Sequence, residues 1–316
     1  MIPRAGTAAA GLLLYLDVLA APYAWVTNQG DDTVSVIDTA TAQVVATVSV
    51  GHRPAGVVAS HDGRRVYVTN PESRDVSIID GPGRKVIATV PLGAGPLGIA
   101  ISPDDESVFI SDWYEHRVDV LDAAALRVVR SVDVGRSPSG LCVTPDGRTL
   151  LVANRDDNTV SLIDLAGKEP GMTVPVGKAP FGVTVTAAGD RAFVANVQSS
   201  DVSVIDLARR RVVNTLAVGS FPYAIAHDPA RDRIFVTNQH DNTVSVIDVG
   251  NAATVATIAV GDYPEGIALH PDGRHVYVAS WFDGSLILID TEELGIVGTI
   301  KTGEGSRAFG DFIAPR

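Results

Sequence analysis

The sequence predicts an all-β fold, a seven-bladed β-propeller of four-stranded antiparallel blades. Two markers that recur every 42 residues predict it. An aspartate closes each run that resembles Val-Ser-Val-Ile-Asp, at Asp38, Asp80, Asp122, Asp164, Asp206, Asp248 and Asp290. A glycine opens a second motif at Gly51, Gly93, Gly135, Gly177, Gly219, Gly261 and Gly303, and in the first six copies a proline follows three residues later. Repeats of about 40 residues with several short strands are typical of propeller blades.

Each repeat contains four short segments rich in β-branched residues. In one copy they span residues 54–60, 66–70, 76–80 and 85–90, and turn residues such as Asp62-Gly63 separate them. Aspartate and glycine favour tight reversals, and no segment shows helical periodicity. We therefore expect four antiparallel strands in each repeat.

The two ends of the chain predict how the ring closes. Residues 308–313 align with the innermost strand of a blade, whereas residues 24–28 align with a second strand. Pairing of these two segments would complete one composite blade and leave no free sheet edge.

The N-terminus predicts export. Arg4 precedes a mostly apolar stretch from Ala8 to Leu19, followed by Ala20. This order is typical of a signal peptide over residues 1–20, which leaves residues 21–316 as a single propeller domain in the periplasm, in the medium or at the cell surface. Asp17 interrupts the apolar stretch, so a disordered or surface-bound leader stays open. No other segment is long and apolar enough for a membrane helix, and we expect no membrane insertion of the mature chain.

Charge and cysteine content narrow the partners. The formal net charge of −12, without a Lys/Arg run, disfavours nucleic acid. Cys142 is the single cysteine and lies in an apolar run, so a structural role is expected and an internal disulfide is impossible. We expect a monomer.

Three copies of one motif carry a family resemblance. Trp25-Val-Thr-Asn28, Tyr67-Val-Thr-Asn70 and Phe235-Val-Thr-Asn238 are each followed by a run like Thr-Val-Ser-Val-Ile-Asp and by Gly-x-x-Pro-x-Gly or a close variant. Residues 24–313 thereby resemble YVTN-family β-propeller repeats. That resemblance implies an exported or surface-layer protein that binds a partner rather than catalyses a reaction.

Loops that differ between blades are the candidate site, because the fold itself demands repetition elsewhere. The loops entering the innermost strands and those between second and third strands should share one face, around the channel mouth. There we expect Phe221, Tyr223 and Tyr263 to supply contact area. Cationic side chains could hold an anionic end of a ligand, namely Arg53, Arg136, Lys178 and Arg307.

Two aromatic pairs stand out in the loops between second and third strands. Trp113-Tyr114 and Trp281-Phe282 occupy equivalent slots in two blades, where the other blades hold mostly polar residues. Such side chains either stack on a ligand or pack under a neighbouring loop, and both alternatives stay open. The asparagines closing the second strands are interpreted as turn residues rather than metal ligands.

The sequence contains no catalytic signature and predicts no cofactor. Histidines on the expected mouth face, His52, His116 and His240, show no ligand spacing. The leading hypothesis is an exported binding protein that holds a small molecule, a glycan or a protein segment at the channel mouth. One alternative, implied by propellers similar to this one, is a metal-dependent lactonase or lyase that would use His52, Asp262, Glu265 and Glu304. A surface scaffold that docks a partner chain is the third.

Overall fold

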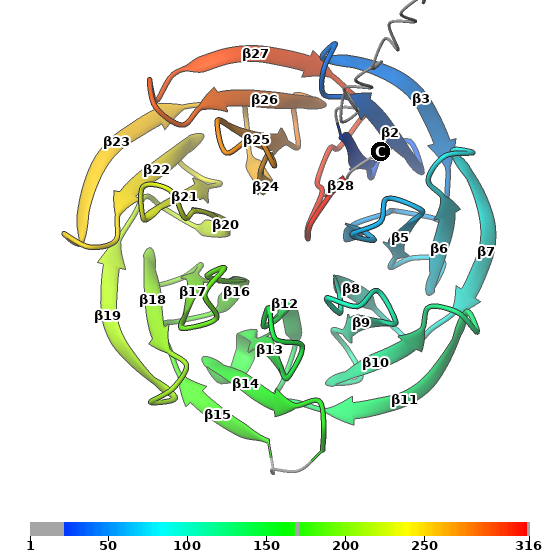
Figure 1. Ribbon diagram of the computed structural model, residues 1–316, viewed down its shortest axis with the longest axis horizontal. Coiled ribbons are helices and arrows are strands. Elements are labelled where there is room, and N and C mark those ends of the chain that lie inside the picture. The colour runs from blue at the N-terminus through cyan, green and yellow to red at the C-terminus, as the bar shows by residue number, and fades with distance from the viewer. Residues whose placement is uncertain (1–21, 168–170, 315–316) are drawn as a thin grey trace, which may run out of the picture.

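The structure is a computed structural model that describes residues 22–167 and 171–314. Its strands form seven four-stranded antiparallel sheets arranged as blades around a central axis (Figure 1). This arrangement confirms the predicted seven-bladed propeller. The N-terminal residues for which a signal peptide is predicted lie outside the described residues. Within the described part of the chain, no helix is long and apolar enough to cross a membrane.

The blades are numbered in chain order, and their strands are as follows. Blade 1 comprises β28 (Ile313–Ala314), β1 (Tyr23–Asn28), β2 (Thr33–Asp38) and β3 (Gln43–Ser49). Blade 2 comprises β4 (Val57–Ala59), β5 (Arg65–Asn70), β6 (Asp75–Asp80) and β7 (Lys85–Pro91). Blade 3 comprises β8 (Pro96–Ile101), β9 (Ser107–Asp112), β10 (Arg117–Asp122) and β11 (Arg127–Asp133). Blade 4 comprises β12 (Pro138–Val143), β13 (Thr149–Asn154), β14 (Thr159–Asp164) and β15 (Met172–Pro175), with the 3-10 turn η1 (Arg155–Asp157) after β13.

The remaining three blades have the same order from the axis outward. Blade 5 comprises β16 (Pro180–Val185), β17 (Arg191–Asn196), β18 (Asp201–Asp206) and β19 (Arg211–Ala217). Blade 6 comprises β20 (Pro222–Asp228), β21 (Arg233–Asn238), β22 (Thr243–Asp248) and β23 (Ala253–Ala259). Blade 7 comprises β24 (Pro264–Leu269), β25 (His275–Ser280), β26 (Ser285–Asp290) and β27 (Ile296–Lys301).

Burial explains why the strands lack a simple alternation of apolar and polar residues. The second and third strands of each blade are buried along almost their whole length, as in β5 and β6, because neighbouring blades cover both faces of the sheet. The outermost strands alternate instead, as in β7, because they form the rim of the propeller. The apolar core therefore lies between the blades.

Repeated polar residues hold the turns. The seven repeated aspartates each accept a backbone N–H from the turn that follows, as when Asp122 Oδ1 accepts from Ala124 at 2.9 Å. In blades 1, 2, 4, 5 and 6 an asparagine ends the second strand and is fully buried, and in blade 6 Asn238 Nδ2 donates to Thr243 Oγ1 and Ser245 Oγ at 3.0 and 2.9 Å. The asparagines thus bracket the loop between second and third strands, which confirms a structural role and adds a cross-strand contact to the predicted turn.

The C-terminal segment closes the ring, as predicted, and joins two blades. In blade 1, Ala24 pairs with Ile313, and the Trp25 N–H donates to the Phe312 carbonyl at 2.8 Å. Toward blade 2, the Val57 N–H donates to the Phe309 carbonyl at 2.7 Å. Between these contacts Gly310 has a φ of +104°, a conformation open to glycine but strained for other residues. Figure 1 shows β28 completing blade 1 beside β1 and β2.

Candidate functional site

Two kinds of loop meet at one end of the propeller, which we call the mouth face. The loop entering each innermost strand bonds to the loop between the second and third strands of the same blade. Examples are the Trp113 N–H donating to the Gly95 carbonyl at 2.9 Å and the Trp281 N–H donating to the Tyr263 carbonyl at 3.1 Å. The opposite end, called the turn face, carries the tight turns between first and second and between third and fourth strands. The predicted site residues therefore share one face.

The channel is filled just below the mouth. Residues that follow the repeated proline gather there from several blades. Ala55, Leu97, Phe181 and Tyr223 belong to one apolar cluster with Phe309, and Glu265 pairs with Arg307 next to Tyr223. Ser139, in the same slot of blade 4, is fully buried. Phe181 and Tyr223 stack with ring centroids 3.9 Å apart, and Phe309 packs against both at 5.4 and 5.1 Å. These rings form an aromatic plug, so Tyr223 lies in the channel rather than on its rim.

A buried ion pair lies beside the plug. Arg307 donates to both Glu265 carboxylate oxygens, with Nε to Oε2 at 2.6 Å and Nη2 to Oε1 at 3.2 Å. Gln239 Nε2 also donates to Oε1 at 2.8 Å, and Arg307 donates to the Tyr223 hydroxyl at 3.2 Å. The Glu265 side chain is only 1% exposed. Burial raises its pKa above the usual range, while Arg307 and Gln239 oppose that shift. Arg307 and Glu265 thus neutralise each other inside the channel.

A continuous set of rings lies above the plug on blades 6 and 7. We call it the aromatic platform: Phe221, His240, Tyr263, Trp281 and Phe282. Phe221 stacks on His240 at 3.6 Å, and Trp281 stacks on Phe282 at 4.9 Å between centroids. Tyr263 joins the two pairs, 5.7 Å from His240 and 5.1 Å from Phe282. Phe282 is 67% exposed and His240 is also exposed, whereas Phe221, Tyr263 and Trp281 are partly buried.

The second aromatic pair is divided between packing and exposure. Trp113 is partly buried against the apolar cluster that contains Phe181 and Phe309, and Arg155 lies over its ring at 5.7 Å. Tyr114 is 68% exposed and covers Gly95, where an added Cβ would meet the Tyr114 ring at 2.5 Å. Packing therefore accounts for the buried part of the Trp113 side chain, whereas the Tyr114 side chain remains accessible to solvent.

The cations predicted to hold an anionic end differ in their surroundings. Arg53 pairs with Glu72 at 3.4 Å, and Arg136 pairs with Asp157 at 2.6 Å. Arg307 pairs with the buried Glu265, as described above. Lys178 is exposed, and no described residue pairs with its ammonium group. The basic arc is thus largely neutralised by its own neighbours.

The residues considered as metal ligands at the mouth do not converge. His52 Nδ1 bonds Asp32 Oδ2 at 2.8 Å, and Asp262 Oδ1 accepts from Asn242 at 2.8 Å. Glu304 is exposed beside Gly30, and Glu265 belongs to the buried ion pair. The hydrogen bond to His52 stabilises its charged form and raises its pKa above the usual value. Among the described residues, the one group of three or more metal-ligating side chains lies elsewhere, at His270, Asp272 and His275 on the turn face.

Three parts of this arrangement were not predicted: the plug residues Phe181 and Phe309, the ring of His240 within the platform, and the His270 cluster. Phe181 and His240 occupy loop slots already compared between blades, so comparing the slots for neighbouring aromatics could have indicated them. The His270 cluster lies on the opposite face, in a turn whose residues differ from those of the other blades.

The family and structure comparisons agree with the fold. Residues 56–147 match the family model described as YNCE-like beta-propeller, which agrees with the YVTN-type resemblance over that segment. No curated protein sequence matches the chain.

Solved structures similar to the chain share its fold at low identity. Kuenenia stuttgartiensis hydrazine synthase is 22% identical with a TM-score of 0.77, covering 90% of this chain and 99% of the other. A functionally unknown protein from Desulfotomaculum acetoxidans is 17% identical with a TM-score of 0.79, covering 92% and 99%. The dihydro-heme d1 dehydrogenase NirN, in complex with DHE, is 20% identical with a TM-score of 0.69, covering 91% of this chain but 65% of NirN. At these identities the likenesses show the propeller fold alone.

Proposed function

We propose that this propeller is a binding protein whose aromatic platform takes an extended polypeptide segment carrying apolar and basic side chains. The observation that carries the proposal is the continuous set of partly and fully exposed rings from Phe221 to Phe282. Exposed tyrosine, tryptophan and phenylalanine gathered in one patch are typical of protein interfaces and supply most of their binding energy.

The filled channel favours a segment that lies on the surface. Small-molecule sites are concave and bury most of their ligand. Here Phe181 and Phe309 are 6% and 7% exposed, so the plug leaves the platform as a broad floor rather than a deep pocket. An extended polypeptide can lie across such a shallow surface and contact several rings at once.

Charge favours a basic partner. The exposed carboxylates of Asp241, Asp262, Asp283 and Glu304 lie in the loops that carry or border the platform. The chain as a whole has a net charge of −12. Lysine or arginine in the segment would therefore be attracted to the platform, which mainly accelerates association.

Selection of a displayed random-peptide library on the intact protein tests the proposal. We expect enriched peptides that combine aromatic or aliphatic residues with lysine or arginine. Phe282→Ala should weaken their binding at least about tenfold with little change in melting temperature, because its ring is mostly exposed. Trp281→Ala should weaken binding similarly.

The matched control is Val297→Ala, an exposed apolar residue of β27 away from the mouth, which should leave the affinity unchanged. The proposal fails if no peptide is enriched, or if both platform variants bind as the wild type does. Selective binding on a glycan array, without peptide enrichment, would replace the polypeptide by a carbohydrate ligand.

We further propose that the protein acts after export, with residues 1–20 removed. Support comes from the order of Arg4, the apolar stretch and Ala20. The intact mass of the protein isolated from its own host should correspond to a chain that begins at Ala21. A mass that includes the first 20 residues would contradict export through this leader.

A further inference from the structure

The turn between the first and second strands of blade 7 differs from its counterparts. In blades 2, 3 and 4 this turn begins with a hydroxyl residue that donates to an aspartate two positions later, as when Thr144 Oγ1 donates to Asp146 Oδ1 at 2.6 Å. In blade 7 the hydroxyl residue is replaced by His270, and the residue three positions after Asp272 is His275. The shared turn needs neither histidine, so the fold alone does not account for them.

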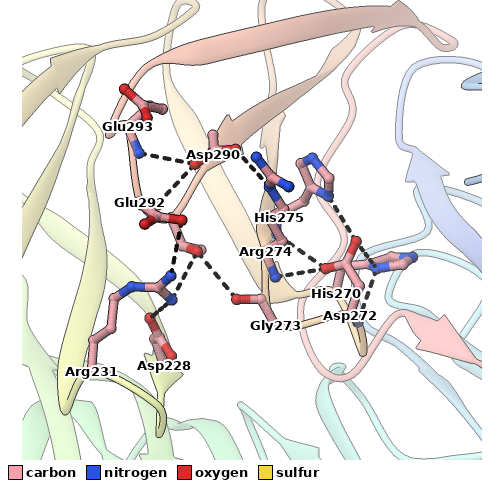
Figure 2. Close-up of polar contacts among 11 residues, drawn as sticks. Asp228, Arg231, His270, Asp272, Gly273, Arg274, His275, Asp290, Glu292 and Glu293 are labelled. Carbon is pink, nitrogen blue, oxygen red and sulfur yellow. Dashed lines mark hydrogen bonds and ion pairs between the residues drawn. The ribbon is translucent and has the colours of Figure 1, made fainter.

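The two histidines converge on one carboxylate oxygen. His270 Nδ1 and His275 Nδ1 lie 2.9 and 2.7 Å from Asp272 Oδ2, and the three atoms lie within 4.8 Å of one another. Figure 2 shows the Asp272 carboxylate between the two imidazoles. His270 is largely buried and packs on the Tyr277 ring, whereas His275 and Asp272 are more open to solvent. One side of the group is therefore accessible to an ion.

The hydrogen bonds of His270 leave a lone pair facing the carboxylate. Thr39 Oγ1 donates to the Pro22 carbonyl at 2.7 Å, so it accepts from His270 Nε2–H at 3.1 Å. With Nε2 donating to Thr39, the other ring nitrogen, Nδ1, faces the Asp272 carboxylate and lies 3.2 Å from the Asp272 backbone N–H. Two lone pairs 2.9 Å apart repel unless a proton or a metal ion lies between them, and a metal ion can take the place of that proton. A metal-ligating histidine is usually oriented by such a bond on its other nitrogen.

We propose that His270, Asp272 and His275 bind a divalent transition-metal ion of the Zn²⁺ class, with solvent completing its coordination. Two imidazoles and one carboxylate suit such ions, whereas Mg²⁺ and Ca²⁺ prefer oxygen ligands. The site joins blade 7 to blade 1 through Thr39, next to the seam where the ring closes. All three ligands belong to blade 7, so a bound metal would fix the imidazole of His270 that contacts blade 1 through Thr39. The site lies on the face opposite the platform, so this inference does not depend on the proposed function.

Calorimetric titration of untagged, chelator-treated full-length protein with ZnCl₂ tests the site. We expect one equivalent to bind and the melting temperature to rise, because an ion bound to the folded state alone stabilises it. His270→Thr and His275→Thr, which restore the residues of blade 4, should each lower the Zn²⁺ affinity at least about tenfold and remove the thermal shift. MgCl₂ should produce neither effect.

The matched control is His61→Ala on the turn of blade 2, where His61 pairs with Asp105 at 2.6 Å without a second histidine. This variant should bind Zn²⁺ as the wild type does. Asp272→Asn serves as a second test of the site if a threonine variant folds poorly. Absence of Zn²⁺ binding by the wild type, or binding that persists in both threonine variants, would overturn the proposal.

Discussion

Deleting residues 306–316 is expected to abolish cooperative unfolding. The segment supplies the innermost strand of blade 1 and bonds to both β1 and β4, so its loss opens the ring and exposes two strand edges. Phe312 is fully buried, and Phe312→Ala alone should lower the free energy of unfolding by about 3–5 kcal/mol. Circular-dichroism melting and size-exclusion chromatography measure both effects.

Deletion of residues 315–316 alone is the control and should melt like the full chain, because the paired residues end at Ala314. A monomeric deletion variant lacking residues 306–316 that melts like the wild type would contradict closure by this segment. Phe312→Ala should be less stable than the wild type and more stable than the variant lacking residues 306–316.

Arg307→Met is expected to destabilise the propeller by about 3–5 kcal/mol, since it leaves the Glu265 carboxylate buried without its cation. The loss should depend on pH. Burial already raises the pKa of Glu265 in the folded state, and removing Arg307 removes the main opposing influence. The folded variant then holds its proton to a higher pH than the unfolded chain does. Its free energy of unfolding, relative to the wild type, should therefore fall as pH rises from about 4 through the raised pKa.

Denaturant unfolding at several pH values measures this effect. The double variant Glu265→Gln/Arg307→Met should recover much of the lost stability, because it buries no unpaired charge. Arg136→Met, which breaks the exposed pair with Asp157, should lower the free energy of unfolding far less than Arg307→Met does. Equal losses for Arg307→Met and Arg136→Met, with no pH dependence, would show that the channel ion pair contributes little.

The fold could be predicted because its signal is repeated. The aspartates and glycines recur at one spacing, and each marks a turn whose chemistry is local to a few residues. The composite blade followed from the same spacing, because residues 308–313 and residues 24–28 fill complementary strand positions. Local patterns of this kind do not depend on which blades are neighbours.

The candidate site was harder to predict because its contacts cross between blades. Sequence comparison assigned the aromatic residues to one face, yet it could not show that Tyr223 lies in a plug while Phe282 stands in solvent. Arg307 was expected on the rim to hold an anion, and the structure places its guanidinium against the buried Glu265 carboxylate. That contact joins blade 7 to the C-terminal segment, so no local pattern indicates it.

The His270 cluster, in contrast, is local in the sequence and was not predicted. His270, Asp272 and His275 lie within six consecutive residues, and comparing this turn with Thr144 and Thr149 of blade 4 would have indicated that two residues change together. Their proximity to Thr39 of blade 1 needed the folded ring.

Amide hydrogen–deuterium exchange, with and without a library-selected peptide, tests the binding role of the aromatic platform most directly. Slower exchange in residues 219–223, 239–242, 261–265 and 281–284 is the result we predict, because these loops carry the platform rings and their neighbours. Protection confined to the turn face or to the outer strands, or no protection at a saturating peptide concentration, would contradict a binding role for the platform.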